Sequence, residues 1–158
     1  MRSRSDSRVG RLREVKSVAA GWIAAIIGFG ATQAYAVNCT LGVQSVIFGS
    51  YDTLSAQNTD SAGSVSVSCD SSDSFTIALS SGHGTLLSRQ MQSGAYSMAY
   101  NFYTDSLRSI IWGDGTSGTV LVSTTGTSAT YAVYGRIPAG QNLPAGSYSD
   151  LIAVTLTF

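Results

Sequence analysis

Beyond Lys16 the sequence contains no lysine, and basic residues of any kind are scarce. Six of the nine lysine and arginine residues lie within the first 36 positions, which leaves three arginines against seven aspartates in residues 37–158. The net charge of that part is therefore about −4. A nucleic-acid-binding protein needs a basic surface that displaces counterions from phosphates, and anionic membrane surfaces attract basic residues in the same way. The composition argues against both as partners.

Histidine is equally scarce, because His83 is the only one. It lies between Gly82 and Gly84, in a context typical of a solvated turn. Most aspartates also lie in turn contexts, where the carboxylate caps its own backbone, and Asp70 and Asp73 lack the glycine and glutamate of a calcium loop. Catalysis needs a nucleophile beside a base, or two carboxylates in different environments. We therefore expect no enzyme, no catalytic residue, no metal site and no cofactor.

No hydrophobic run is long enough to span a membrane. The apolar stretch over residues 18–31 is about 14 residues long, against the roughly 20 that a spanning helix needs. It follows a basic segment and precedes Ala34-Tyr35-Ala36, which has the small-x-small form of a cleavage site. This order predicts a cleaved secretory signal peptide over residues 1–36, with a membrane anchor as the alternative. We expect export to the periplasm or beyond, and a single domain over residues 37–158 that does not insert into the membrane.

Only two cysteines are present, Cys39 and Cys69, and both lie in the part expected to be exported. An even number of cysteines in an oxidising compartment predicts a disulfide. Zinc is the alternative, but two cysteines and the distant His83 make a poor set of ligands. A bridge that closes a loop of this length stabilises a protein by about 3.5 kcal/mol in the chain-entropy model.

No part of residues 37–158 shows a sustained helical period. Short alternating runs such as Val65–Cys69, Phe75–Leu79 and Thr130–Ile137 are separated by glycine, serine and aspartate, which predicts an all-β sandwich or barrel. We expect turns or loops at residues 82–84, 112–115 and 123–126. The aromatic residues of such strands usually pack in the core. Trp112 is the exception we consider, because it immediately precedes a loop and could contact a ligand there.

The alternating pattern is strongest in the final strand. From Leu151 to Phe158 there is no charge, proline or glycine. The apolar residues Ile152, Val154, Leu156 and Phe158 fall on one face of this strand. An unprotected strand edge invites another chain to pair with it, and natural proteins either block such edges or use them. The pattern indicates a domain that a partner completes.

The order of several short motifs resembles one family, the spore coat protein U domain, which also forms the subunits of archaic chaperone–usher pili. The matching elements, in chain order, are Phe48–Asp52, the strand that ends at Cys69, Arg89–Met91, Tyr100–Asp105, Trp112–Gly115 and Gly135–Asp150 followed by the terminal strand.

The resemblance implies an immunoglobulin-like β-sandwich that lacks its last strand. A periplasmic chaperone would lend the missing strand, and in the assembled fibre the N-terminal extension of the next pilus subunit would fill the gap instead, with an outer-membrane usher as a further partner. Ile152, Val154, Leu156 and Phe158 would then border the acceptor groove. The terminal carboxylate of Phe158 would be an anchor for a basic residue of the chaperone.

One departure from the family pattern concerns the segment before the first cysteine. After cleavage at Ala36 only Val37 and Asn38 would precede Cys39, which is too short for a donor strand. We therefore expect a tip or accessory subunit of a surface fibre that supports adhesion and biofilm formation. Two alternatives stay open, a self-contained secreted coat protein and a small glycan-binding lectin that uses Trp112.

Overall fold

The structure, a computed structural model, describes residues 37–158. The predicted signal peptide, residues 1–36, lies outside the described residues. All regular structure within 37–158 is β-strand, and no helix there is long and apolar enough to cross a membrane. In chain order the strands are β1 (Cys39–Gln44), β2 (Thr59–Leu79), β3 (His83–Thr85), β4 (Ser88–Ser93), β5 (Tyr96–Tyr103), β6 (Val122–Ile137) and β7 (Val154–Thr157).

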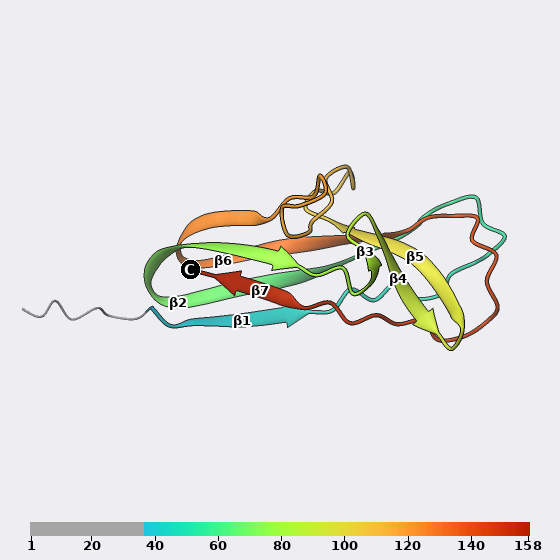
Figure 1. Ribbon diagram of the computed structural model, residues 1–158, viewed down its shortest axis with the longest axis horizontal. Coiled ribbons are helices and arrows are strands. Elements are labelled where there is room, and N and C mark those ends of the chain that lie inside the picture. Colours follow the sequence, from blue (N-terminus) through green and yellow to red (C-terminus); the bar gives the residue numbers. More distant parts are fainter. Residues whose placement is uncertain (1–36) are drawn as a thin grey trace, which may run out of the picture. The chain divides into compact units, whose positions relative to one another are not determined.

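The longest pairing is an antiparallel ribbon formed by β2 and β6. It runs from Thr59 opposite Ile137 to Ile77 opposite Val122, with a shift of register at the polar residues 70–73. Figure 1 shows both strands turning back at this place, on the left of the view, so the two halves of the ribbon face each other. Each half therefore belongs to a different layer of a β-sandwich. The apolar residues alternate along both halves, which places one hydrophobic face of each layer toward the inside.

β1 and β7 lie along the same edge of β2, because β6 follows the other edge throughout. β1 pairs with the first half of β2, where Cys39 lies opposite Cys69, and β7 pairs with the second half, where Val154 lies opposite Leu79. Since the ribbon folds over, β1 and β7 belong to different layers at the same side of the sandwich. Among the described residues no strand lies between them, so this side is open.

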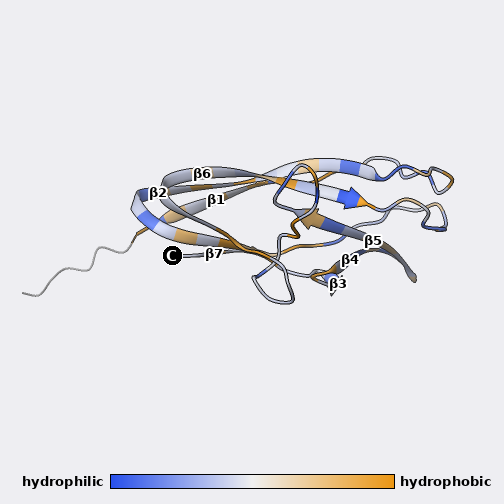
Figure 2. Ribbon diagram, turned by 90° about the horizontal axis from the view of Figure 1, so that it is seen from above, coloured by the Kyte–Doolittle hydropathy of each residue, from blue (hydrophilic) through white to orange (hydrophobic). Residues whose placement is uncertain are grey.

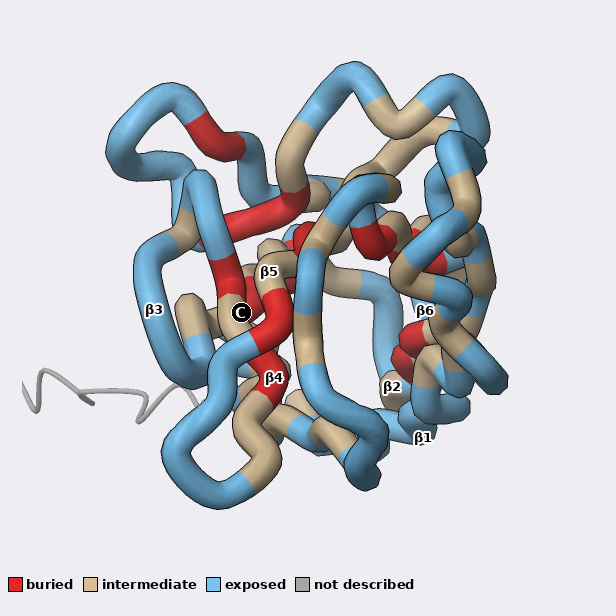
Figure 3. The backbone as a smooth tube through the Cα atoms, turned by 90° about the vertical axis from the view of Figure 1, so that its right-hand side faces the viewer, coloured by how far each residue is buried: buried red, intermediate tan, exposed pale blue. Residues whose placement is uncertain are grey.

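The remaining strands extend the first layer beyond β6. Residues 101–103 of β5 pair with residues 134–136 of β6, and β4 and then β3 follow by antiparallel pairing. Figure 3 shows buried stretches of β4 and β5 in red, with exposed loops around them. These strands carry the hydrophobic residues that face the segment leading to β7.

Two adjoining hydrophobic clusters fill the interior. Figure 2 shows hydrophilic colour at the bend of β2 and hydrophobic bands farther along the strand. Ile152 packs against both clusters and so joins them. The buried members of the first are Val65, Val67, Phe75, Ile77, Leu79, Trp112 and Val133, and those of the second are Met91, Met98, Tyr100 and Ile137.

The structure confirms the all-β sandwich and the disulfide. The sulfur atoms of Cys39 and Cys69 are bonded, and the bridge joins the start of β1 to β2 at the end of its first half. It thereby fixes the open-edge strand β1 to the folded ribbon.

Three predictions about strand boundaries were wrong. Residues 123–126 are not a turn, because this stretch of β6 stays paired to the second half of β2. The stretch at residues 82–84 is only partly a turn, since β3 already begins at His83. The regular part of the terminal strand is shorter than Leu151–Phe158 and covers only Val154–Thr157.

Candidate strand-binding groove

A groove of about 1280 Å³ opens at the side of the sandwich where β1 and β7 lie. Its first wall is formed by residues 41 and 43–53, and its second wall by residues 143–152 together with Val154. Pockets for small molecules usually measure about 300–1,000 Å³. A long groove of greater volume fits an extended chain segment better than a small ligand. Residues of both hydrophobic clusters line its floor: Val65, Leu79, Met91, Met98, Tyr100, Val133 and Ile137.

The first wall depends on two glycines in the ribbon beneath it. A side chain at Gly63 would collide with the backbone of residues 44–45, and one at Gly135 would collide with the side chains of Val46 and Phe48. The absence of a Cβ at these two positions lets residues 44–48 pack directly on β2 and β6. The hydroxyl of Ser61 also donates a hydrogen bond to the carbonyl of Ile47, at 2.6 Å.

The second wall is held by backbone pairing on both sides of Asp150. The N–H of Gln92 in β4 donates to the Ser149 carbonyl at 2.8 Å, and Ser149 returns a hydrogen bond at 3.1 Å. Farther on, Ala153 accepts a hydrogen bond from the Ser80 N–H at 3.0 Å and donates to the Ser80 hydroxyl at 2.9 Å. These bonds fix which backbone groups of the segment face the protein.

The hydrogen-bonding pattern leaves one edge free on each wall. In an antiparallel pair, residues alternate between those that exchange hydrogen bonds with the partner and those whose N–H and C=O point away. Ala153 bonds to Ser80, so the backbone groups of Val154 and Leu156 point to the unpaired edge of β7. On β1, the Asp70 N–H donates to the Asn38 carbonyl, so by the same alternation the backbone N–H and C=O groups of Leu41 and Val43 point away from β2. The two free edges could each accept hydrogen bonds from an inserted strand.

Apolar side chains are exposed along the first wall. Leu41, Val43 and Ile47 have exposed fractions of 38%, 57% and 78%. Exposed apolar side chains beside an unpaired strand edge are typical of an interaction site on a soluble protein. The geometry therefore offers both hydrophobic contacts and main-chain hydrogen bonds to a strand.

The four predicted interface residues fall into three environments. Ile152 and Val154 line the groove and are partly buried. Leu156 packs against the first cluster but does not line the groove, and Phe158 is 57% exposed beyond the end of β7. The structure thus brings Ile152 and Val154 together with Leu41 and Val43, which sequence analysis did not single out. Nothing in the sequence tells that β1 faces the terminal strand.

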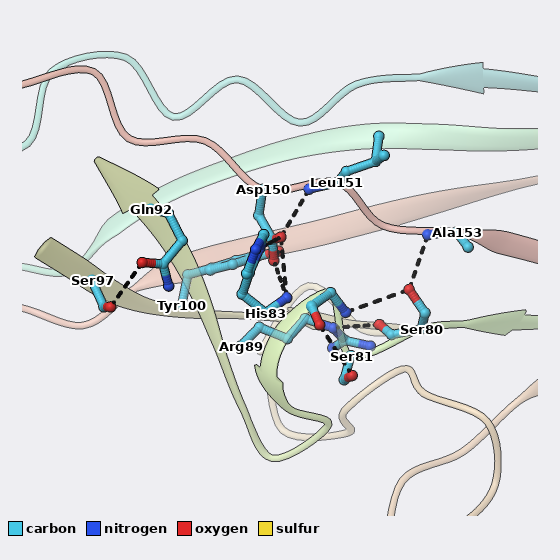
Figure 4. A network of polar contacts seen from close by, with 11 residues as sticks. Ser80, Ser81, His83, Arg89, Gln92, Ser97, Tyr100, Asp150, Leu151 and Ala153 are labelled. Carbon is cyan, nitrogen blue, oxygen red and sulfur yellow. Dashed lines mark hydrogen bonds and ion pairs between the residues drawn. The ribbon is translucent and has the colours of Figure 1, made fainter. Parts of the chain in front are cut away.

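A buried polar network lies behind the second wall (Figure 4). The side chain of Asp150 is 2% exposed. Its carboxylate accepts hydrogen bonds from the Tyr100 hydroxyl at 2.8 Å, the Leu151 N–H at 2.8 Å and the His83 N–H at 3.2 Å. The Nδ1 atom of His83 lies 2.8 Å from the same carboxylate, while the imidazole is 61% exposed. Burial, together with the hydrogen bond to Asp150, raises the pKa of Tyr100, so the phenol keeps its proton to a higher pH than an exposed tyrosine does.

A second buried polar group, Arg89, supports the same region. Its guanidinium donates to the carbonyls of Ser80 at 2.9 Å and Trp112 at 2.8 Å, and also to the side-chain oxygen of Asn101. The ring of Phe102 lies 5.7 Å from the guanidinium carbon. Burial lowers the pKa of Arg89. Sequence analysis noticed this arginine only as part of a family motif and assigned it no contacts.

Trp112 does not lie where a ligand could stack on it. Its exposed fraction is 0%, and its indole Nε1–H donates to the Ile77 carbonyl at 3.0 Å. The ring packs edge-on against Tyr131. The expectation that Trp112 contacts a ligand was wrong, because the residues before the loop turn the indole into the core.

Charged groups near the surface are already paired or capped. Asp60 forms two hydrogen bonds with Arg136, at 2.8 and 2.9 Å, and lies 3.2 Å from Arg108. The hydrogen bond from Arg136 holds the pKa of Asp60 below its usual range, and the charge of Arg108 acts in the same direction. Within residues 37–158 no group of three histidine, cysteine or carboxylate side chains is arranged to hold a metal ion.

An all-β sandwich with an open side between β1 and β7 is the class of fold that the geometry defines. The chain belongs to the Spore Coat Protein U domain family, whose model matches residues 26–155. Protein U of Myxococcus xanthus is 32% identical over 152 residues, which cover 90% of this chain and 76% of that protein.

A solved structure has the same immunoglobulin-like fold. It is a chain of the CsuC–CsuE chaperone–tip adhesion subunit pre-assembly complex from the archaic chaperone–usher Csu pili of Acinetobacter baumannii. The TM-score is 0.58 with 20% sequence identity, over 78% of this chain and 40% of that one. The chain thus spans less than half the length of this structural neighbour.

Proposed function

We propose that the protein is a structural subunit of a secreted surface fibre, completed by a strand that a partner inserts between β1 and β7. The observation that carries the proposal is the groove with a free backbone edge on each wall. Strand addition uses main-chain hydrogen bonds for affinity and alternate side chains for specificity. A β-sandwich subunit of this kind has no need of a catalytic site or cofactor.

The comparisons support the partners in this proposal. The structural neighbour comes from a complex of a chaperone with a tip subunit. We propose that a periplasmic chaperone fills the groove first, that an outer-membrane usher and other pilus subunits follow, and that the protein reaches the cell surface. A tip or accessory position, with a role in adhesion and biofilm formation, is the form of the proposal that agrees with the short segment expected before Cys39.

The proposal predicts that an added strand stabilises the protein. The full chain is expressed in a bacterial periplasm with and without ten alternating valine and threonine residues, fused after Phe158 through a flexible glycine–serine linker. The inserted strand would cover Leu41, Val43 and Ile47 and pair with the free edge of β7. We expect a higher soluble yield and a melting temperature raised by about 10 °C or more. A fusion of the same residues in blocks, without alternation, controls for added length.

Two further variants locate the strand. Ile152→Asp places a charge in the groove, whereas Ala153→Asp places one at an exposed position of the same segment that does not line the groove. We expect the first to abolish the stabilisation by the fused strand and the second to leave it intact. Equal effects of the two variants would contradict binding at this groove.

A self-contained secreted coat protein is the second candidate, favoured by the family's name and by the 32% identity with Protein U. In that case the chain without a fused strand is a soluble monomer. Its melting temperature equals that of the fusion.

A further inference from the structure

The groove's second wall contains a buried anion whose place in the sandwich is not explained by burial of apolar surface. Asp150 stands between Ser149, which pairs with β4, and Ile152, which joins the two hydrophobic clusters. Burying a carboxylate is costly unless its oxygens accept several hydrogen bonds. Here the donors come from Tyr100 on β5, from His83 on β3 and from the backbone of the wall itself.

The donors reach Asp150 from elements that lie far away in the sequence. His83 is 67 positions and Tyr100 is 50 positions from Asp150. The carboxylate thus ties the wall segment to both β3 and β5 at the point where the segment leaves β4 and approaches β2. Figure 4 shows Asp150 and the side chains of Tyr100 and His83 meeting beneath the segment that leads to Ala153.

We call Asp150 and its donors on His83, Tyr100 and Leu151 the Asp150 clamp. The clamp determines which side chains of the wall segment face the groove. Successive residues of an extended segment point to opposite sides, so a slip by one residue exchanges the inward and outward side chains. Such a slip would turn Ile152 away from the two hydrophobic clusters and bring Leu151, which is 86% exposed, toward them. It would also turn the free N–H and C=O groups of Val154 away from an incoming strand. Because Asp150 lies on the same side as Ile152, the slip would also withdraw its carboxylate from the donors on His83 and Tyr100, and the buried Tyr100 hydroxyl would lose its acceptor.

We propose that Asp150 is a positioning residue for strand capture, which holds residues 149–157 in the accepting register while the groove is empty. The inference rests on the proposed function. The proposal states that the wall segment already has the accepting register before the strand binds. Loss of the clamp should therefore lower the association rate constant more than it raises the dissociation rate constant. After capture the inserted strand itself holds the segment in register through main-chain hydrogen bonds.

The test compares full-length wild-type protein with Asp150→Asn and with Asp73→Asn. Asparagine at position 150 replaces one carboxylate oxygen by an NH₂ group, which would face the donor groups of His83 and Tyr100. Asp73 lies at the bend of β2, away from the groove, where its carboxylate accepts a bond from the N–H of Ser74. The probe is a fluorescent synthetic peptide of 15 residues with alternating valine and threonine, and fluorescence anisotropy gives association and dissociation rate constants.

We expect Asp150→Asn to lower the association rate constant at least tenfold, with the dissociation rate constant changed less than threefold. Asp73→Asn should change neither. An equal association rate constant for wild type and Asp150→Asn, or an equal loss in both variants, overturns the proposal. A merely stabilising role would lower the melting temperature without separating the two rate constants.

Two measurements keep the proposal testable if Asp150→Asn does not fold. Tyr100→Phe removes one donor and keeps the carboxylate. We expect its association rate constant to be lower than that of the wild type. Where Asp150→Asn can be measured, the value for Tyr100→Phe should lie between those of the wild type and Asp150→Asn. Hydrogen exchange on the empty wild-type chain should show the amides of Ser149, Leu151 and Ala153 protected as well as those of β4. Free exchange of these three amides overturns the proposal. Failure of the wild type to bind the peptide contradicts the proposed function instead, and the exchange measurement still decides on the clamp.

Discussion

Arg89 is a cation in the core whose direct partners are neutral. It donates to the carbonyls of Ser80 and Trp112 and to the side chain of Asn101, and so connects β4 with the end of β2, the loop at Trp112 and β5. Such a group is costly to bury, yet once it is in place its acceptors depend on it. The residue therefore supports the strands from which the clamp donors His83 and Tyr100 project.

Replacing this guanidinium should be severe. Arg89→Met has a similar length but no donors, so the carbonyls of Ser80 and Trp112 would be left buried and unpaired. We expect the free energy of unfolding to fall by about 3–5 kcal/mol. Guanidinium chloride unfolding of the strand-fused protein gives the value, and the matched control is Arg136→Met.

Arg136 forms a partly exposed pair with Asp60, so its loss should cost no more than about 1 kcal/mol. Similar losses in the two variants would show that the buried hydrogen bonds of Arg89 contribute little.

At the scale of elements, the first wall of the groove is the segment that follows β1, and it packs directly against two glycines. Residues 44–48 leave β1 and pass over β2 at Gly63 and over β6 at Gly135. Contact this close is possible only without side chains at both positions. The width of the groove therefore depends on residues that do not line it.

This dependence predicts the effect of one added methyl group. Gly135→Ala would push Val46 and Phe48 outward, because the new Cβ would overlap their side chains. We expect a loss of about 1–3 kcal/mol in stability and weaker binding of an alternating peptide. Ala132→Val adds apolar volume at an exposed position of the same strand and serves as the control. Unfolding curves and peptide titrations of both variants measure the two effects. Unchanged peptide affinity in Gly135→Ala would contradict the dependence of the groove on this glycine.

The same elements show what sequence patterns predict and what they miss. Alternation at Val65–Cys69 and Phe75–Leu79 identified both halves of β2, because side-chain burial follows the strand period locally. The polar residues 70–73 suggested two separate strands, since the pairing with β6 on both sides of these residues is a long-range property. Trp112 was misplaced for a similar reason, as its partner Ile77 lies 35 positions away.

The candidate site was predictable only on one wall. Ile152 and Val154 stood out because the terminal segment alternates without interruption. The clamp at Asp150 could not be predicted, because aspartate before a strand usually caps a turn and its partners here come from β3 and β5. Pairing of distant elements, rather than local propensity, assembles this part of the groove.

At the scale of the domain over residues 37–158, seven aspartates face three arginines, and several of these carboxylates are held in their charged form. The hydrogen bond from Arg136 lowers the pKa of Asp60, hydrogen bonds from the backbone and side chain of Asn38 lower that of Asp70, and those from Thr116 lower that of Asp114. In each case the folded state binds a proton less readily than the unfolded chain, whose aspartates have a pKa of about 3.9.

This difference fixes the sign of the pH dependence. Above the pKa of the unfolded chain both states are ionised, so the stabilising contribution of these carboxylates is complete at neutral pH. Below it the unfolded chain takes up protons first, and the contribution is lost as the pH falls through the lowered pKa values of the folded state. We expect the strand-fused protein to be equally stable at pH 7 and pH 5 and to become markedly less stable toward pH 3. Urea unfolding across this range measures the loss, and Asp60→Asn should make the acid slope shallower because one of the shifted groups is gone. A free energy of unfolding that is the same at pH 3 and pH 7 would contradict the assignment of these aspartates as charged hydrogen-bond acceptors.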